Sequence, residues 1–215
     1  MLREYNLYAD LQRVRLEIAL KRLIFLILIP VFAIVLGACS GTEENFEETT
    51  INVEKRGRVS ENIVESFDKD YYDIEELKSE FSGAVSDYNE TIGGEEIKLK
   101  KVELKDSKVY VNIDFNGPSD YERFVGEKLF VGTIDDAYDN GYSMDVTLKG
   151  VENGDRIGKV QIMGMRDKDI VILSEHVRIN TFRDIAYVSA NVDVIGSKSA
   201  RVVNESDGLA YLILK

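Results

Sequence analysis

Histidine-based chemistry is limited from the outset, because the chain contains a single histidine, His176. A zinc hydrolase of the H-E-x-x-H kind needs a second histidine at ligand spacing, and the sequence has none. A serine hydrolase would have to combine His176 with a nucleophile elbow of the G-x-S-x-G type, which is also missing. We therefore predict that His176 is an ordinary strand residue within the stretch SEHVRI.

Carboxylates are numerous, and two clusters, at residues 68–73 and 135–140, gather side-chain oxygens that calcium could use. Neither cluster has the glycine and terminal glutamate of an EF-hand loop at the required positions. Helix capping explains Asp73, and the first turn of a helix explains Asp135 and Asp136. Paired carboxylates also hydrolyse glycosides, but among so many acids such pairs arise by chance. The sequence therefore predicts no catalytic residue, no metal ligand and no cofactor.

The only cysteine, Cys39, follows an apolar run at residues 23–35 that two basic residues precede. A basic flank, a short apolar core and small residues before a cleavage point are typical of a secretory signal peptide. A transmembrane helix would need about 20 apolar residues. Residues 23–38 offer 16, with Pro30 among them. An uncleaved anchor and a buried core helix remain as alternatives, although Pro30 would interrupt the hydrogen bonding of either helix.

The four residues at the end of this segment resemble the lipobox of bacterial lipoproteins: Leu36, Gly37, Ala38 and Cys39. The resemblance implies that Leu36, Gly37 and Ala38 are read by the signal peptidase and that Cys39 carries a diacylglyceryl thioether. It also implies a lipid-anchored protein on the extracytoplasmic face of the bacterial cell membrane. Residues 1–38 are then the signal peptide, with a native start hypothesised at Leu20. A ribosome-binding sequence before codon 1 and none before codon 20 would refute that start.

The net charge of the chain limits the classes of partner that it is expected to bind. The formal net charge is −12, and the first 38 residues hold five basic and three acidic side chains, so the remainder is near −14. A surface this acidic repels phosphate backbones, which argues against nucleic acid as a partner. Membrane contact is therefore expected through the lipid on Cys39. Because Cys39 is the only cysteine, the folded part has no disulfide and must be stabilised by a packed core.

The pattern of residues after Cys39 predicts an acidic tether over residues 39–50 and a single domain over 51–215. Asp73 and Gly93 delimit the clearest helix. A hairpin with its turn at 105–108 follows, and its first strand needs a bulge near residues 100 and 101 to stay in register.

From residue 144 onward the sequence consists of closely spaced apolar segments and turns, which predicts strands near 144–151, 157–165, 169–174 and beyond. The expected fold class is α+β. A few helices in the first half would pack on a mostly antiparallel sheet or small barrel. The sequence does not decide whether the sheet closes.

Three further stretches carry a second resemblance: LFVGTIDDAYDNGY at 129–142, YVSANVDV at 187–194 and YLILK at 211–215. Together they resemble small uncharacterised lipoproteins of Gram-positive gut bacteria. This resemblance covers most of the chain after Cys39, supports the same location and implies no activity.

These observations favour a non-catalytic binding or interaction module, with an envelope protein or glycan as its partner. The alternative is a carboxylate-dependent hydrolase that acts on cell-envelope glycans. A deep cleft holding two acids with perturbed pKa values would favour the hydrolase. A solute-binding subunit of a transporter is less favoured, because such proteins usually have two α/β lobes.

Overall fold

A computed structural model describes residues 47–69, 72–203 and 208–215. The chain divides into two compact units, Met1–Glu44 and Asn45–Lys215, and every described residue belongs to the second. The predicted signal peptide and all four lipobox residues, Leu36 to Cys39, lie outside the described residues. No helix in the described part is long and apolar enough to span a bilayer.

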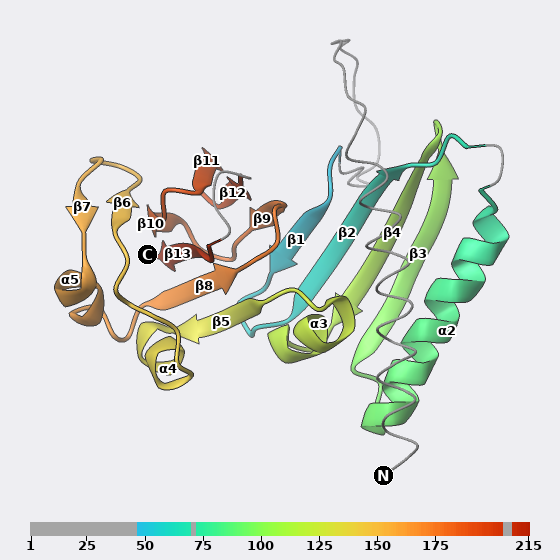
Figure 1. Cartoon of the computed structure of the whole chain (residues 1–215), viewed down its shortest axis with the longest axis horizontal. Helices are drawn as coiled ribbons and strands as arrows, with labels where there is room; N and C mark the ends of the chain where they lie inside the picture. Colours follow the sequence, from blue (N-terminus) through green and yellow to red (C-terminus); the bar gives the residue numbers. More distant parts are fainter. Residues whose placement is uncertain (1–46, 70–71, 204–207) are drawn as a thin grey trace. The chain divides into compact units, whose positions relative to one another are not determined.

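The first sheet has seven strands and contains both the beginning and the later part of the folded unit (Figure 1). All neighbouring strands run antiparallel except β1 and β9, which are parallel, so the sheet is mixed. The strands, in spatial order, are β11 (Val192–Gly196), β12 (Ser199–Val202), β9 (Arg178–Asn180), β1 (Thr50–Val53), β2 (Val59–Ser66), β4 (Lys108–Phe115) and β3 (Ile97–Lys105).

The second sheet has six strands, and all its neighbours run antiparallel. Two neighbouring interior strands, β8 and β13, are apolar along almost their whole length. In spatial order the strands are β5 (Leu129–Thr133), β8 (Asp169–Leu173), β13 (Ala210–Leu214), β10 (Ile185–Val188), β6 (Leu148–Gly150) and β7 (Arg156–Ile157).

Four helices occur in the described residues: α2 (Ile74–Ile92), α3 (Pro118–Val125), α4 (Ile134–Asp139) and α5 (Lys159–Met163). Asp73 caps α2 by accepting hydrogen bonds from two first-turn amides, and Gly93 ends it in the left-handed conformation at φ 80°, as predicted. Thr133 and Asp136 form a reciprocal capping box at the start of α4.

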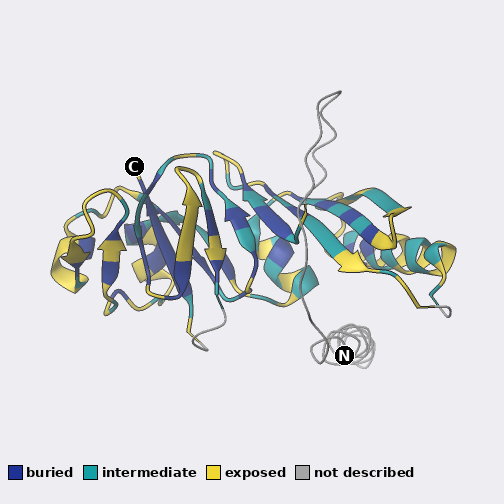
Figure 2. Cartoon of the chain, turned by 90° about the horizontal axis from the view of Figure 1, so that it is seen from above, coloured by how far each residue is buried: buried dark blue, intermediate teal, exposed yellow. Residues whose placement is uncertain are grey.

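One apolar core joins the two sheets, because strand residues of both belong to the same cluster of buried side chains. Val171 and Leu212 of the second sheet face this core, together with Ile51 and Ile113 of the first. Their neighbours along β8 and β13 face a second core that α4 and α5 cover. Strands buried on both faces are apolar at successive positions. Figure 2 shows buried residues along these strands.

The expected fold class is wrong: the folded unit is predominantly β rather than an α+β arrangement of helices on one sheet. The apolar segments of the second half form a sheet of their own, and its packing against the first sheet replaces the expected helical layer. Both sheets are open, with edge strands β11 and β3 in one and β5 and β7 in the other. The segment expected as a strand at 157–165 is mostly the short helix α5.

Two local expectations can be judged directly. The bulge predicted near residues 100 and 101 is confirmed, because the pairing of β3 with β4 shifts register between Leu99 and Lys101. The tether expected to extend to residue 50 ends earlier, since β1 begins at Thr50 and Glu48 already makes ion pairs with the sheet. Thr50 is fully buried, which explains why this polar residue belongs to the fold.

Leu212→Ala in the full chain should lower the free energy of unfolding by about 2–5 kcal/mol, because it empties a buried position between the sheets. Urea unfolding followed by circular dichroism measures this change. Val160→Ala is the matched control: Val160 is 84% exposed on α5, so its truncation should cost less than about 0.5 kcal/mol. Equal effects of the two substitutions would contradict a core shared by the two sheets.

Candidate functional site

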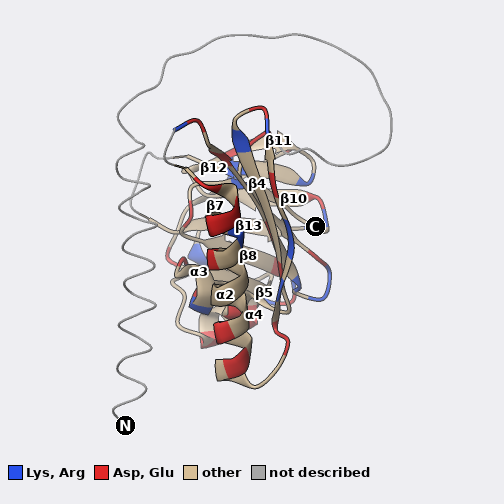
Figure 3. Cartoon of the chain, turned by 90° about the vertical axis from the view of Figure 1, so that its right-hand side faces the viewer, with Lys and Arg blue, Asp and Glu red and all other residues tan. Residues whose placement is uncertain are grey.

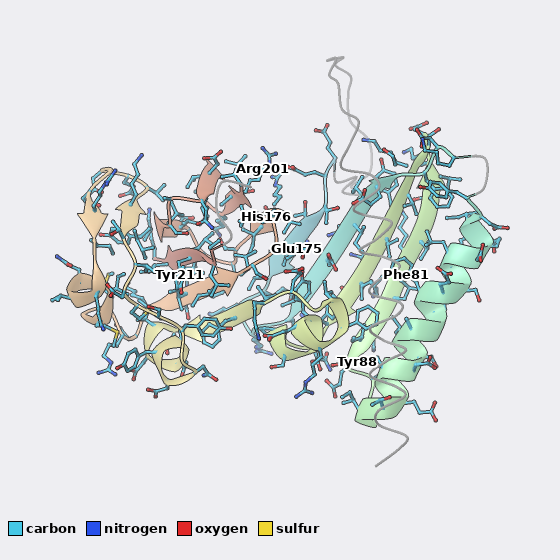
Figure 4. All side chains as sticks on the ribbon, in the orientation of Figure 1. Phe81, Tyr88, Glu175, His176, Arg201 and Tyr211 are labelled. Atoms are coloured by element: carbon cyan, nitrogen blue, oxygen red, sulfur yellow. The ribbon has the colours of Figure 1, made fainter. Side chains whose placement is uncertain are left out.

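His176 is exposed and lies in the connection between β8 and β9 (Figure 4). The prediction that it is a strand residue is therefore wrong, because β9 begins two residues later, at Arg178. Its neighbour Glu175 is buried. Cys39 and the rest of the lipobox fall outside the described residues, so lipidation stays a prediction.

The two acidic clusters have structural roles where they are described. Asp73 caps α2, and Asp135 accepts a hydrogen bond from Arg166 Nε at 2.6 Å. Hydrogen bonds from the side chain and backbone of Thr133 lower the pKa of Asp136. Within the described ranges, no group of three or more His, Cys, Asp or Glu residues is placed to hold a metal ion.

Glu61 on β2, Tyr121 on α3 and Glu175 after β8 form a buried cluster that no sequence pattern predicted. The Tyr121 hydroxyl donates a hydrogen bond to Glu175 Oε2, although the two residues are 54 positions apart. Burial raises the pKa of Tyr121 far above its ordinary value, and the nearby charges of Glu61 and Glu175 raise it further. Tyr121 therefore remains a neutral donor.

This cluster links the β4–β5 connection to the β8–β9 connection, and both connections run from one sheet to the other. Tyr121 lies on the helix that links β4 to β5, and Glu175 lies in the segment that links β8 to β9. A second pair of contacts reinforces the junction: Ser174 Oγ donates to Glu127 Oε2 and accepts from the Lys128 backbone N–H, both at 2.8 Å. Because Glu61 and Glu175 are both buried, a polymer substrate cannot reach either carboxylate in this conformation.

The side of the seven-stranded sheet that faces away from the core carries two aligned rows of polar side chains, most of them half-buried and one of them, Thr50, fully buried. Strand pairing places one residue of each row opposite the next, from β12 at one end to β3 at the other. We call these two rows the polar face. The first row is Arg201, Arg178, Thr50, Asn62, Asn112 and Lys101, and the second is Ser199, Asn180, Asn52, Ser60, Asp114 and Lys98.

Amide side chains connect the strands of the polar face to one another. Asn180 Nδ2 donates to Asn52 Oδ1 at 2.8 Å, and Asn52 Nδ2 donates to Ser60 Oγ at 3.2 Å. In the other row Asn112 Nδ2 donates to Asn62 Oδ1 at 2.7 Å. Within the described part of the chain, Asn62 Nδ2 and Asn180 Oδ1 make no hydrogen bond, and both residues are half-buried. The polar face thus offers a donor and an acceptor on fixed side chains.

The polar face carries charges of both signs. Its four cations each lie near a carboxylate: Lys101 pairs with Glu103 at 2.5 Å, Lys98 with Glu95 at 3.6 Å, and Arg178 and Arg201 with Glu48. The other side of the sheet is covered by α2, along which acidic residues recur (Figure 3).

Glu48 lies at the arginine end of the polar face. Arg201 donates to both oxygens of the Glu48 carboxylate, at 2.7 and 2.8 Å from Nη2. These hydrogen bonds raise the pKa of Arg201 above its already high ordinary value. The guanidinium is therefore a permanent cation.

Part of this surface was visible in the sequence. Alternation along β4 separates buried Val111 and Ile113 from half-buried Tyr110, Asn112 and Asp114. The rest depended on strand pairing, because β1 and β9 lie side by side only through a long-range parallel contact. No signal within either segment predicts that contact.

Comparison with known proteins finds no matching family, no matching curated protein and no matching solved structure. Both resemblances stated from the sequence therefore stay predictions. The assignment of the candidate site rests on the geometry of the polar face.

The free energy of unfolding should fall as pH rises from about 10 to 12, because burial raises the pKa of four tyrosines in the fold: Tyr88, Tyr121, Tyr142 and Tyr211. Burial and the hydrogen bond to Asp120 raise the pKa of Tyr88 to about 12, and that of Tyr121 is raised further (Figure 4). In this range the unfolded chain loses tyrosine protons that the folded chain keeps, so alkaline pH favours unfolding. Urea unfolding at several pH values measures the slope.

Tyr88→Phe should flatten this alkaline decline, because phenylalanine has no proton to lose. Tyr138→Phe is the control. Because Tyr138 is 47% exposed on α4, this variant should show the same decline of stability with pH as the original protein. An unchanged slope in Tyr88→Phe would show that Tyr88 ionises equally in both states.

Proposed function

We propose that this protein is a lipid-anchored, extracytoplasmic binding module that holds a cell-envelope glycan on its polar face. The observation that carries the proposal is the pair of aligned amide, hydroxyl and cationic rows on the outer side of the seven-stranded sheet. Sugar hydroxyls donate and accept hydrogen bonds, as do the side chains of Asn62 and Asn180. A repeating glycan therefore matches a repeating polar surface.

The arrangement of the polar face suits a preorganised site. Its side chains stand on paired strands, and hydrogen bonds between amides fix Asn52, Asn112 and Asn180 before any ligand arrives. Rigid side chains lose little conformational entropy on binding, so more of the contact energy appears as affinity. Six neighbouring strands span roughly 24 Å at about 4.8 Å between strands, which favours an oligomer over a monosaccharide.

The anchor in this proposal is the lipid that the lipobox predicts on Cys39. Residues 40–46 would then link the lipid to the folded unit. One lipid chain anchors a protein only marginally, so the several chains of a lipoprotein cysteine would be needed for stable attachment. The hydrolase alternative gains no support from Glu61 and Glu175, because both carboxylates are buried.

Cys39→Ser should abolish incorporation of labelled fatty acid and move the protein out of the tightly bound membrane fraction, because serine provides no thiol for the thioether. Labelling in a bacterial host, followed by membrane fractionation, measures both effects. Ser40→Ala is the adjacent control and should leave both unchanged. Continued labelling of Cys39→Ser would show that lipid is attached elsewhere or that the lipobox is not used.

Asn62→Ala should weaken binding of the full chain to purified envelope polysaccharide by about three- to tenfold, because it removes a hydrogen-bond donor on the polar face. Sedimentation of the detergent-solubilised protein with the insoluble polysaccharide gives the dissociation constant.

Asn153→Ala is the matched control, since Asn153 is an exposed amide in the turn between β6 and β7 of the other sheet. It should bind as the original protein does, and circular dichroism would confirm that both variants are folded. Equal binding by all three proteins would exclude the polar face as the site, and no binding by the original protein would refute the proposed function.

A further inference from the structure

The arginine end of the polar face already holds a carboxylate from the chain itself. Arg201 donates to both oxygens of Glu48: Nη2 lies 2.7 Å from Oε1 and 2.8 Å from Oε2, and Nε lies 3.1 Å from Oε2. Arg178 Nη1 approaches Oε1 to 3.9 Å from the adjacent strand. Two guanidinium groups therefore converge on one carboxylate, a geometry that matches the planar oxyanion.

Strand pairing holds the backbones of the two arginines, whereas the hydrogen bonds of the Arg201 side chain go to Glu48. The two arginines lie on the neighbouring strands β12 and β9, directly opposite each other in the register. Arg178 Nε also donates to Ser199 Oγ at 3.0 Å, which fixes its direction along the polar face. If Glu48 moved away, Arg201 would lose its three hydrogen bonds to that carboxylate, and another carboxylate could take the same place between the two guanidinium groups.

Glu48 is in a position to leave. It precedes β1, whose first residue is Thr50, so it belongs to the segment that enters the fold and not to a strand. The side chains of Glu48 and Arg201 are 34% and 48% exposed, and ion pairs with such access to water contribute only about 0.2–1 kcal/mol. A ligand with its own carboxylate and further contacts along the polar face would compete effectively.

We propose that Arg178 and Arg201 bind a carboxylate of an acidic glycan and that Glu48 occupies this site as an internal competitor until the glycan displaces it. This inference rests on the proposed function, because the rest of the glycan would lie along the amide rows. It specifies the ligand class as a polysaccharide with uronic-type carboxylates. It also couples ligand binding to a movement of the segment before β1. We expect the ligand group to be a carboxylate, because the two arginines already hold the carboxylate of Glu48.

The test measures binding of polygalacturonate and of its methyl ester to the full chain in detergent by isothermal titration calorimetry. The acid form should bind at least tenfold more tightly than the ester, which has no charged oxygens. Glu48→Gln should tighten binding of the acid form by about two- to fivefold, because the competing carboxylate is gone. Arg201→Gln should weaken it at least tenfold and should abolish the gain from Glu48→Gln.

Glu54→Gln is the matched control. Glu54 forms an exposed ion pair with Arg58 at 2.6 Å in the turn between β1 and β2, so this variant removes the same charge from the same kind of pair. It should bind polygalacturonate as the original protein does. If Glu54→Gln tightened binding as much as Glu48→Gln does, the tighter binding would come from the change in net charge alone, and the proposal would be overturned.

Two other outcomes would also overturn it: equal binding of acid and ester, or tighter binding of poly(glycerol phosphate) than of polygalacturonate. If the protein still binds envelope polysaccharide in the sedimentation assay, these results refute the carboxylate site and leave the proposed function standing. Absence of binding in both assays would refute the two together.

Discussion

The fold depends on burial of apolar strands on both of their faces. Val171 and Leu212 pack toward the seven-stranded sheet, while Ile172 and Ile213, one position further along, pack toward α4 and α5. Since apolar burial contributes about 25 cal/mol per Å², these two strands supply stability to both layers at once. The outer side of the seven-stranded sheet is therefore not needed for the core. Polar side chains can occupy it without loss of stability.

Buried polar contacts stabilise the connections between the sheets, as apolar packing stabilises the core. Tyr121 and Glu175 join the β4–β5 and β8–β9 crossings through a buried hydrogen bond, with Glu61 close to it. A buried polar group is costly unless it is hydrogen-bonded, so these residues define one arrangement of the crossings more sharply than apolar packing would. They determine how the sheets meet, and none of the three belongs to the polar face.

Local features of the fold were predictable, and long-range ones were not. Asp73, Gly93 and the bulge after Leu99 were identified because caps and alternation are encoded within a few residues. The fold class was wrong because an apolar segment such as 169–173 does not reveal which sheet it joins. The polar face was not predicted as a site: alternation along β4 separates Asn112 from buried Val111 and Ile113, but the parallel contact of β1 with β9 has no local signature.

That parallel contact bears on when the chain can fold. Asn52 of β1 and Asn180 of β9 are 128 residues apart, so the first strand gains its second neighbour only after most of the chain has been made. Pairings of such high contact order form slowly, because a long loop must close before they contribute. The parallel contact that builds the polar face therefore also delays completion of the seven-stranded sheet until most of the chain has been synthesised.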